Sequence, residues 1–364
     1  MSLRVAFTSA FTWPEVSRGG ERYVHELAAA LGRRGHTVRI VSSAPEPGRD
    51  TVMGVPVRRL RRRTWLAPRG RGFAAEMSFG PQALVALAAA PIDVWHAVTI
   101  SDAAAATRVA RLRPGLRTVY TDLGFPARAS RERRPDHAAF QRVVRDVDVY
   151  ACLSEPVATH LRADYGRDPE VVGAGVDLTA FEPAPRDPRP TLLFASSLDE
   201  ERKNAPMLLD AAARLLDEYP DLQVWLLGPG DPTALLDAAP ERVRAAVTRA
   251  ELVDRDQLAR DYARAWVTVL PSRAEAFGLV ALESLAAGTP AVVLQGGGAE
   301  GIVTPDTGFA VTEDLDALVD GLRAALDRSR EGDVVEACRE RARAFDWDTA
   351  IAARFEQLYV EAGR

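Results

Sequence analysis

The chain has 364 residues, of which 47% are hydrophobic and 27% charged, and its formal net charge is −5. This composition fits about two globular domains and excludes general disorder and a chain built to bind nucleic acid. No apolar run is long enough for a transmembrane helix. The N-terminal segment turns polar too soon for a signal peptide, and the two cysteines are too far apart for a disulfide framework or a zinc motif. We therefore expect a cytoplasmic protein.

The first half of the chain alternates short apolar runs with amphipathic stretches. The apolar runs predict strands, and the first two strands are separated by a helix predicted over Glu21–Arg33. The predicted strands are Leu3–Ser9, Thr37–Ser42, Val55–Leu60, Val94–Ala97, Thr118–Thr121, Val149–Leu153 and Val171–Val172. Strands that alternate with helices predict a parallel sheet covered by helices on both faces.

A proline-rich segment, Asp177–Pro190, interrupts this pattern and predicts a linker. The alternation then restarts, and a last helix is predicted over Trp347–Ala362 with Asp346 as its N-cap. Between them we predict strands at Thr191–Ala195, Gln223–Leu227, Trp266–Leu270 and Ala291–Leu294, and helices at Ala205–Tyr219, Leu258–Ala265, Leu279–Ala287, Asp316–Asp327 and Val334–Ala344. We expect two Rossmann-like α/β domains, residues 1–180 and 181–345, whose strand ends face one cleft.

Lys203 is the only lysine among the 46 Lys and Arg residues of the chain. A lysine in such an arginine-rich chain indicates a position that needs a compact ammonium group, although chance placement explains it equally well. It follows Arg202 in the loop Ser197–Asn204, between a predicted strand and a predicted helix. A cation at this helix entry suits a phosphate, and the alternative is an ordinary solvated loop.

A helix that opens on Phe277, Gly278 and Leu279 follows the next predicted strand. The free amides at such a helix start suit a diphosphate. Glu283, inside the helix among small apolar residues, can accept hydrogen bonds from vicinal hydroxyls such as those of a ribose. Glu275, before the helix, can reach the group beyond the phosphates. The alternative for Glu283 is an ordinary acid of an amphipathic helix.

The pair Gly19–Gly20 lies just before the first predicted helix. Two glycines let the backbone approach a ligand closely, and a helix N-terminus favours an anion. A plain tight turn explains the pair equally well.

These segments together resemble the family-4 glycosyltransferases, enzymes of GT-B fold that use nucleotide-sugar donors. The resemblance extends over almost the whole chain and is most specific at the two glutamates separated by seven residues. The matching segments are GGER with GRRGHTVRIV, SEPVATHLRADYG, GVDLTAF, LDEERKN, PSRAEAFGLVALESLAAGTPAVV, GGGAE and FDWDTAIAARFEQLY. The resemblance implies an acceptor-binding first domain, a donor-binding second domain, and a C-terminal helix within 346–364 that packs back on the first domain.

The resemblance also implies roles for single residues. Lys203 would hold the donor diphosphate, and Glu275 would contact the transferred sugar. The backbone of Phe277–Leu279 would bind the phosphates, Glu283 would bind the ribose, and Gly20 would close the site from the first domain.

The base of the donor would lie near Gly228, Gly230 and Glu251–Gln257. The family mostly retains the anomeric configuration, and its proposed front-face mechanism lets the leaving phosphate of the donor take the acceptor proton. The resemblance implies no cofactor and no metal, and it leaves a UDP-, GDP- or dTDP-sugar open as the donor.

Two positions depart from the family pattern. The family usually has an arginine where this chain has Ser197, and we hypothesise that Arg202 supplies that charge instead. The family also tends to have a histidine shortly after a threonine that corresponds to Thr121, and none is present here. Asp122 is then a candidate for a sugar-hydroxyl contact or a base. His96 is the nearest histidine by pattern, and a packed structural histidine is an equal interpretation.

Three functions fit these observations. An active glycosyltransferase is favoured because Lys203, Glu275 and Glu283 are all present. A non-catalytic relative that binds a nucleotide or a partner enzyme is the first alternative. Another GT-B nucleotide-sugar enzyme, such as a non-hydrolysing epimerase, is the second, and the C-terminal helix and the glutamate spacing speak against it.

The acceptor is expected to be a small molecule, a saccharide or a lipid. The arginine-rich segment Arg58–Arg71 suits an acidic acceptor or an anionic membrane surface at its inner face, with a solvated loop as the alternative. Aromatic residues near Trp13, Trp65, Phe79 and Phe125 are candidates for stacking on an acceptor ring.

Overall fold

The computed structural model describes residues 2–16, 19–63, 71–125, 132, 134–250 and 254–363, with residues 71–74 as backbone only. The chain divides into two compact units. Unit 1 consists of Met1–Gly175 together with Trp347–Arg364, and unit 2 consists of Val176–Asp346. The boundaries predicted from the sequence were 180/181 and 345/346.

Unit 1 is built on an eight-stranded sheet of order β3-β4-β2-β1-β5-β6-β7-β8. All neighbouring strands are parallel except β3 and β4, which form an antiparallel edge hairpin. The strands are β1 (Arg4–Ser9), β2 (Thr37–Ala44), β3 (Gly48–Val52), β4 (Val55–Arg61), β5 (Val94–Ala97), β6 (Arg117–Asp122), β7 (Val149–Cys152) and β8 (Glu170–Val171). Strands such as β1 and β5 are almost wholly buried because helices cover both faces of a parallel sheet.

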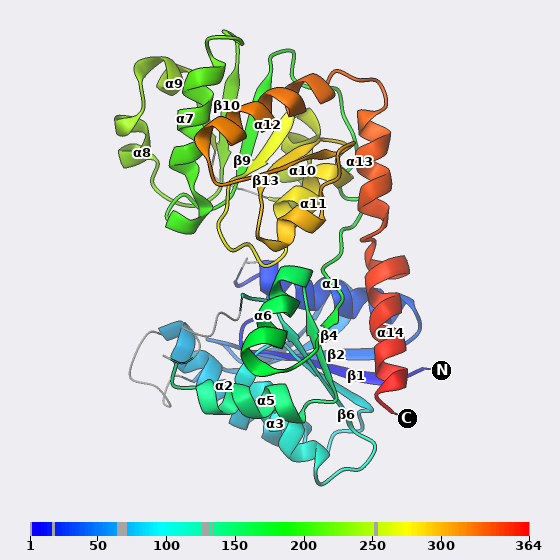
Figure 1. The fold of residues 1–364 in the computed structure, drawn as a ribbon. Helices are drawn as coiled ribbons and strands as arrows, with labels where there is room; N and C mark the ends of the chain where they lie inside the picture. Colours follow the sequence, from blue (N-terminus) through cyan, green and yellow to red (C-terminus); the bar gives the residue numbers. More distant parts are fainter. Residues whose placement is uncertain are drawn as a thin grey trace. The chain divides into compact units, whose positions relative to one another are not determined.

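The helices of unit 1 connect these strands (Figure 1). They are α1 (Gly19–Arg33), α2 (Arg71–Leu87), α3 (Ile100–Ala110), α5 (His137–Asp146), α6 (Glu155–Tyr165), the π-helical segment η3 (Trp347–Ile351) and α14 (Ala352–Glu361). The last two belong to unit 1 because Trp347 packs within it. Its indole Nε1 donates to Glu26 at 3.0 Å, and a Cβ on Gly175 would lie 2.3 Å from its ring. No helix of the described residues is both long and apolar enough to cross a bilayer.

Unit 2 is built on a six-stranded, all-parallel sheet of order β11-β10-β9-β12-β13-β14. Its strands are β9 (Thr191–Ala195), β10 (Gln223–Leu227), β11 (Val247–Ala250), β12 (Val267–Leu270), β13 (Ala291–Leu294) and β14 (Gly308–Val311). One face of the sheet forms a buried core with α7 (Ala205–Leu215) and α12 (Leu315–Arg328), which pack against each other (Figure 1).

The other helices of unit 2 complete this α/β arrangement. They are η1 (Glu201–Lys203), α8 (Thr233–Ala238), α9 (Glu241–Ala246), α10 (Arg255–Arg264), α11 (Leu279–Ala286), η2 (Gly298–Gly301) and α13 (Val334–Arg343). Helix α11 packs against α10 and α13. The carboxyl ends of β9, β10 and β12 are adjacent in the sheet order, so the loops that follow them share one edge.

The structure corrects the sequence analysis at several elements. Strands β3, β11 and β14 were not predicted, because GRDTV, VTRA and GFAV are short and partly polar or glycine-containing. Gly19–Gly20 form the first residues of α1 instead of a loop before it. The predicted helix from Trp347 begins as the π-helical segment η3, so Asp346 does not cap an α-helix.

Candidate active site

Two loops of unit 2 meet through a charge cluster at the carboxyl ends of β9 and β12. The Nζ atom of Lys203 lies 2.8 Å from Oε2 of Glu275, and Nη1 of Arg202 lies 3.4 Å from the same oxygen. Lys203 is 9% exposed, whereas the side chain of Arg202 is about half exposed and also pairs with Glu200. Both cations of the first loop therefore converge on one carboxylate oxygen of the second.

Backbone contacts fix this geometry. The amide of Arg273 donates to the carbonyl of Arg202 at 2.8 Å, which ties the two loops together. The carbonyl of Glu275 accepts from the amide of Gly298 at 2.7 Å, so the glycine-rich loop after β13 supports the glutamate from behind. A Cβ on Gly297 would lie 3.1 Å from that carbonyl, so the close approach favours glycine there.

Helix α11 begins next to Glu275 with a glycine as its N-cap. Gly278 has φ +101°, a left-handed conformation that favours glycine, and a Cβ there would lie 2.6 Å from that of Ala299. A glycine has no side chain to cap the first amides of the helix, so these amides are available to an anion. Phe277 is buried and packs edge to face on Phe345, which anchors the residue before the helix.

Glu283 is 4% exposed on the buried side of α11. Its Oε2 accepts a hydrogen bond from the hydroxyl of Tyr262 on α10 at 3.2 Å. A buried carboxylate needs such a partner, and no local pattern in the sequence predicted that Tyr262 supplies it. In the same strand-end region Ser272 is buried, and its Oγ has no hydrogen-bond partner among the described residues.

The loop after β10 packs directly on the loop after β9. Gly228 has φ +134°, and a Cβ on it would lie 2.3 Å from the carbonyl oxygen of Ser196. The amide of Leu198 donates to the carbonyl of Pro229 at 2.9 Å. Gly230 likewise approaches Asp199. Ser197, which stands between these contacts, is partly exposed. The predicted donor residues of unit 2 thus gather at one edge of its sheet.

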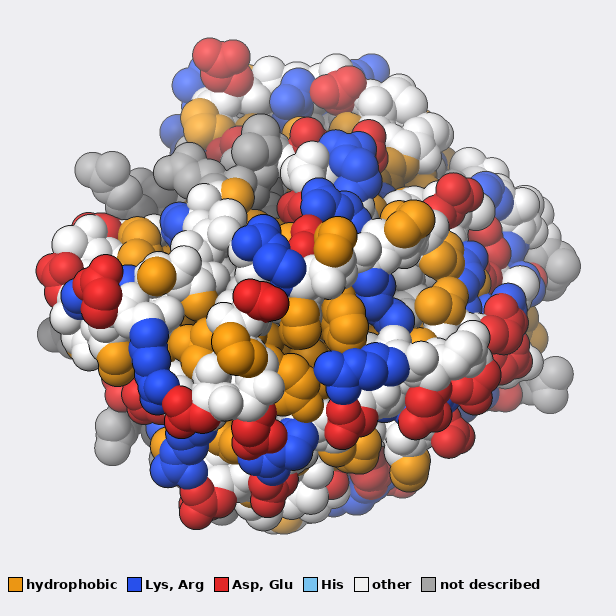
Figure 2. Space-filling model, turned by 90° about the horizontal axis from the view of Figure 1, so that it is seen from above, with side chains coloured by type: hydrophobic (Ala, Val, Ile, Leu, Met, Phe, Trp, Pro, Cys, Tyr) orange, Lys and Arg blue, Asp and Glu red, His pale blue; other side chains and the backbone are white. Residues whose placement is uncertain are grey.

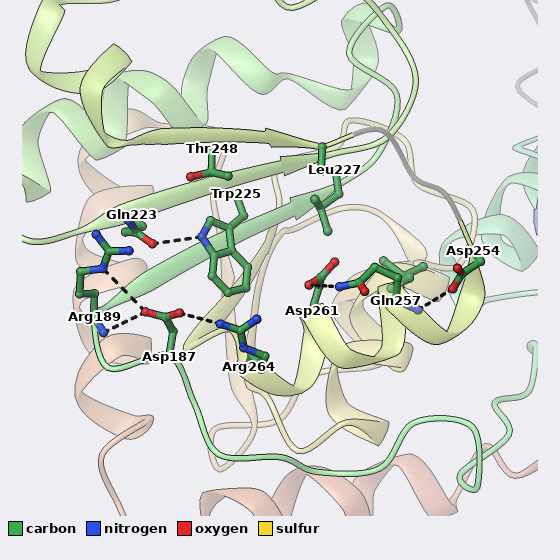
Figure 3. A pocket seen from close by; sticks show the side chains of 12 residues that line it. Asp187, Arg189, Gln223, Trp225, Leu227, Thr248, Asp254, Gln257, Asp261 and Arg264 are labelled. Atoms are coloured by element: carbon green, nitrogen blue, oxygen red, sulfur yellow. Dashed lines mark hydrogen bonds and ion pairs between the residues drawn. The ribbon is translucent and has the colours of Figure 1, made fainter.

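A cavity of about 400 Å³ lies along β10, β11 and α10 (Figure 3). Trp225 projects into it, and the guanidinium of Arg264 lies 5.4 Å from the centroid of its indole ring. Arg264 also pairs with Asp187 at 3.0 Å. On the α10 side, Gln257 donates to Asp261 at 2.9 Å, and burial raises the pKa of that carboxyl.

One end of this cavity reaches the segment predicted to hold the base. Asp254 and Gln257 line it, while residues 251–253 lie outside the described residues. Gly228 and Gly230 are not among its lining residues. Trp225 and Asp261 were not predicted to line a cavity, because a tryptophan within a strand and an acid within a helix carry no local signal of one.

In unit 1, Asp122 ends β6 and is buried. Its Oδ2 accepts from the hydroxyl of Tyr150 at 2.9 Å, and its Oδ1 accepts from the amide of Gly124 at 3.1 Å. Gly20 on α1 lies beside this segment, since a Cβ on it would be 3.4 Å from Leu123. Both oxygens of Asp122 are thus engaged within the protein.

His96 is fully buried at the end of β5. Its Nδ1 pairs with the hydroxyl of Tyr359 on α14 at 2.7 Å, and its Nε2 pairs with that of Thr121 at 2.7 Å. Burial lowers the pKa of the imidazole to about 3. With both ring nitrogens engaged, the geometry favours the interpretation as a packed structural histidine that holds α14 on the sheet.

The aromatic candidates for the acceptor differ in exposure. Trp13 is partly exposed and lies 6.1 Å from the ring of His25, and Phe125 is partly exposed and packs edge to face on His160. Phe79 is fully buried, so the prediction that it stacks on an acceptor is wrong for this structure. Trp65 lies outside the described residues.

Comparisons with known proteins match both halves of the chain. Residues 17–180 match the family model described as Glycosyltransferase Family 4, and residues 189–328 match the one described as Glycosyl transferases group 1. The chain belongs to the family-4 glycosyltransferases.

Curated relatives of this family-4 chain include a D-inositol 3-phosphate glycosyltransferase of Streptomyces bingchenggensis. It is 32% identical over 62% of this chain and 55% of its own length. An MMP alpha-(1->4)-mannosyltransferase of Mycolicibacterium hassiacum is 32% identical over 61% of this chain and 56% of its own length. The chain thus spans about half the length of the curated relatives it matches.

Solved structures resemble the family-4 chain over nearly its whole length. Sucrose-phosphate synthase from Thermosynechococcus elongatus has a TM-score of 0.80 at 23% identity, covering 99% of this chain and 98% of the other. The Anabaena protein HepE, in complex with UDP and glucose, has a TM-score of 0.71 at 16% identity, covering 98% and 99%. The predicted GT-B class of two Rossmann-like halves is thereby confirmed.

Proposed function

We propose that this protein transfers a sugar from a nucleotide-diphosphate donor to an acceptor hydroxyl, with retention of the anomeric configuration. Its membership of the family supports the reaction class, and the structure of HepE with UDP and glucose supports a nucleotide-sugar donor. UDP-, GDP- and dTDP-sugars are all proposed donors. The acceptor is proposed only as a hydroxyl-bearing small molecule, saccharide or lipid.

The observation that carries the proposal is the convergence of Lys203 and Arg202 on one oxygen of Glu275. Two cations that already meet at one anionic oxygen, beside the uncapped start of α11, suit the oxygens of a diphosphate. Arg202 then supplies the second positive charge that the serine at position 197 lacks.

In the proposed reaction, the bond between the anomeric carbon and the diphosphate oxygen breaks, and the pair of electrons stays on the diphosphate. Lys203, Arg202 and the first amides of α11 stabilise this developing charge. The acceptor oxygen bonds to the same carbon from the same face, and its proton passes to the departing phosphate oxygen. Glu275, released by the cations, is then free to accept hydrogen bonds from the transferred sugar.

Glu283 is proposed to bind the ribose while it keeps its hydrogen bond from Tyr262. A base stacked near Asp254 and Gln257 would use the end of the cavity that these two residues line. Unit 1 is proposed to bind the acceptor, with Gly20 at the start of α1 and with Trp13 and Phe125 as ring contacts. The reaction is proposed to need no metal or cofactor and to take place in the cytoplasm.

Nucleotide binding tests this proposal directly. UDP, GDP, dTDP, ADP and CDP are titrated into the protein by calorimetry, and thermal unfolding is measured with each. The cognate nucleotide at 100 times its dissociation constant should stabilise the fold by about 2.7 kcal/mol. Turnover of the matching nucleotide-sugar, followed by nucleotide release with candidate acceptors, then tests transfer itself.

Three variants locate the binding site. Lys203→Ala and Glu283→Gln should each weaken nucleotide binding by roughly 10- to 100-fold, since each loses a charged hydrogen bond of about 1.5–3 kcal/mol. Glutamine can still accept the hydrogen bond from Tyr262, so the fold should be kept. Arg214→Ala is the matched control, because Arg214 is a half-exposed cation on α7 whose partner is Asp316. If Lys203→Ala and Glu283→Gln change the dissociation constant no more than Arg214→Ala does, the nucleotide binds elsewhere.

A further inference from the structure

Many arginines of the described residues are paired with an acid. Arg323 with Glu218 and Arg62 with Glu15 are typical, at 2.7 and 2.8 Å. On the face drawn in Figure 2, Lys and Arg side chains are interspersed with Asp and Glu. Several arginines that lack an acid partner and also adjoin one cavity are a more distinctive feature than one such arginine.

Such a group lines a cavity of about 320 Å³ in unit 1. Its arginines come from three neighbouring strands: Arg39 from β2, Arg58 from β4 and Arg49 from β3. Apolar residues of β2 and β4 and the last residues of α2, Ala86 and Leu87, form the remaining wall. None of the three arginine side chains has an ion pair or hydrogen bond with any residue that the structure describes.

The strand register places all three side chains on one face. Arg58 is directly opposite Val41 on β2 and directly opposite Arg49 on β3. Directly opposite residues point to the same side of a sheet, and so do residues two apart on one strand, which adds Arg39. Two like charges directly opposite each other destabilise a sheet, and arginine cannot lose its charge.

Asp50, the acid closest in sequence to these arginines, makes its contacts on the other face of the sheet. Asp50, which also borders the cavity, is the one acid on these three strands, and it is opposite Val57 rather than Arg58. Its Oδ2 lies 3.7 Å from Arg59, and its Oδ1 accepts from the amide of Thr51 at 2.7 Å. Side chains alternate between the two faces along a strand, so Asp50 and Arg59 are on the opposite face of the sheet from Arg49 and Arg58.

The end of α2 does not supply the missing negative charge either. A helix C-terminus carries partial negative charge on its last carbonyls. Here Arg113 already donates to the carbonyls of Leu87 and Ala88, at 3.4 and 3.1 Å. Glu76, farther back on α2, pairs with Arg134 at 3.4 Å. Three arginines and one acid, Asp50, therefore line the cavity, and none of the three arginine side chains is paired with a described acid.

We infer that this cavity is a binding site for a phosphate-bearing anion, separate from the proposed transfer site. Arginine forks match phosphate oxygens in pairs, and three of them around one cavity can neutralise a dianion. The site lies on the face of the sheet, in the first half of β2 and the middle of β4, whereas Asp122 lies at the carboxyl end of its strand. The phosphate can belong to a free metabolite or to a lipid headgroup, since both offer the same oxygens.

Binding to two probes tests the site and separates these sources. Inorganic triphosphate is titrated by calorimetry, and vesicles of phosphatidylcholine with and without phosphatidylglycerol are tested by co-sedimentation. Arg39→Gln/Arg58→Gln should weaken binding to at least one probe by about 100-fold. The matched control is Arg108→Gln/Arg142→Gln, which removes the same charge from exposed positions on α3 and α5.

The proposed transfer site is the same in both double variants, so triphosphate bound at that site cancels in the comparison. Selective loss of triphosphate binding supports a free phosphate ligand, and selective loss of phosphatidylglycerol-dependent binding supports a headgroup. Equal weakening in both double variants, or no binding of either probe to the unmodified protein, overturns the inference. Circular dichroism confirms that both double variants are folded.

Discussion

The polar groups at the strand ends differ between the two units in burial and in the partners that they contact. In unit 2, Lys203 and Arg202 share one oxygen of Glu275, and these ion pairs lie partly open to solvent. In unit 1, His96 and Asp122 are buried, and each has two hydrogen bonds inside the protein. The same α/β architecture therefore presents an exchangeable charge cluster in one unit and a fixed network in the other.

The difference indicates which groups a substrate can recruit. Arg202 is half exposed, so its ion pair is worth little. Lys203 and Glu275 are nearly buried, but a diphosphate can replace the carboxylate because it offers Lys203 another negative charge in exchange. A buried group that gives up a hydrogen bond without a replacement loses about 1–3 kcal/mol. Donor contacts are thus expected at the exchangeable cluster, and the fixed network of unit 1 is expected to hold structure.

Glu275→Gln is the substitution with the largest expected effect. The carboxylate competes with phosphate for Lys203 in the free protein and is proposed to bind the sugar during transfer. The substitution should therefore tighten binding of the cognate nucleoside diphosphate several-fold. It should also lower kcat by about 100-fold, which corresponds to about 3 kcal/mol. Calorimetry and steady-state turnover measure the two effects separately.

The prediction for Glu275→Gln combines tighter nucleotide binding with a lower kcat, and either measurement can contradict it. Weaker nucleotide binding in Glu275→Gln would show that the carboxylate helps to hold the nucleotide instead of competing with it. Glu300→Gln is the matched control, because Glu300 is an exposed acid whose Oε2 accepts from the amide of Gly296 in the neighbouring loop. It should change neither quantity by more than about twofold.

The pH dependence of stability tests the fixed network of unit 1. Burial lowers the pKa of His96 to about 3 from an ordinary value near 6.5, so folding favours the neutral ring. Its contribution to stability is fully present above pH 6.5 and is lost as the pH falls toward 3. At pH 5 the loss should be about 2 kcal/mol relative to pH 7.

Urea unfolding of the wild type and His96→Gln at pH 7 and pH 5 measures this loss. Other groups contribute to the pH dependence, including His25, whose pKa burial lowers to about 4. The contribution of His96 is therefore the difference in slope between the two proteins. The variant should be less stable at pH 7, because its contacts with Tyr359 and Thr121 are weakened. Its free energy of unfolding should change less between pH 7 and pH 5 than that of the wild type. A variant of unchanged stability and abolished turnover would make His96 a catalytic group.

The alternating pattern of the sequence predicted most strands of both sheets correctly because parallel strands are buried and read as apolar runs. The strands it missed, β3, β11 and β14, are edge strands, which need less apolar surface. Strand β3 exists because the hairpin turn at Met53 and Gly54 takes positive φ values at both residues and folds GRDTV back on β4.

Lys203, Glu275 and the start of α11 lie at one edge of the sheet of unit 2. Each lies in a loop that follows a predicted parallel strand, and the topology puts the ends of such strands at the same edge. The partners of these residues were not predictable. Tyr262 reaches Glu283 from a neighbouring helix, and Tyr359 reaches His96 from the far end of the chain. Long-range contacts of single polar atoms leave no periodic signal in a sequence.

Arg49→Gln tests the arginine cavity of unit 1 and has the smallest expected effect. Removal of one of two charges directly opposite each other should raise the free energy of unfolding by about 0.5 kcal/mol. Arg59→Gln is the neighbouring control, because it breaks the contact with Asp50 on the other face and should leave stability unchanged or slightly lower. Urea unfolding in low salt measures both. The gain should shrink in high salt, which screens the repulsion, and in triphosphate, which neutralises it. An equal loss in both variants would mean that the aliphatic stem of Arg49 stabilises the hairpin more than its charge destabilises it.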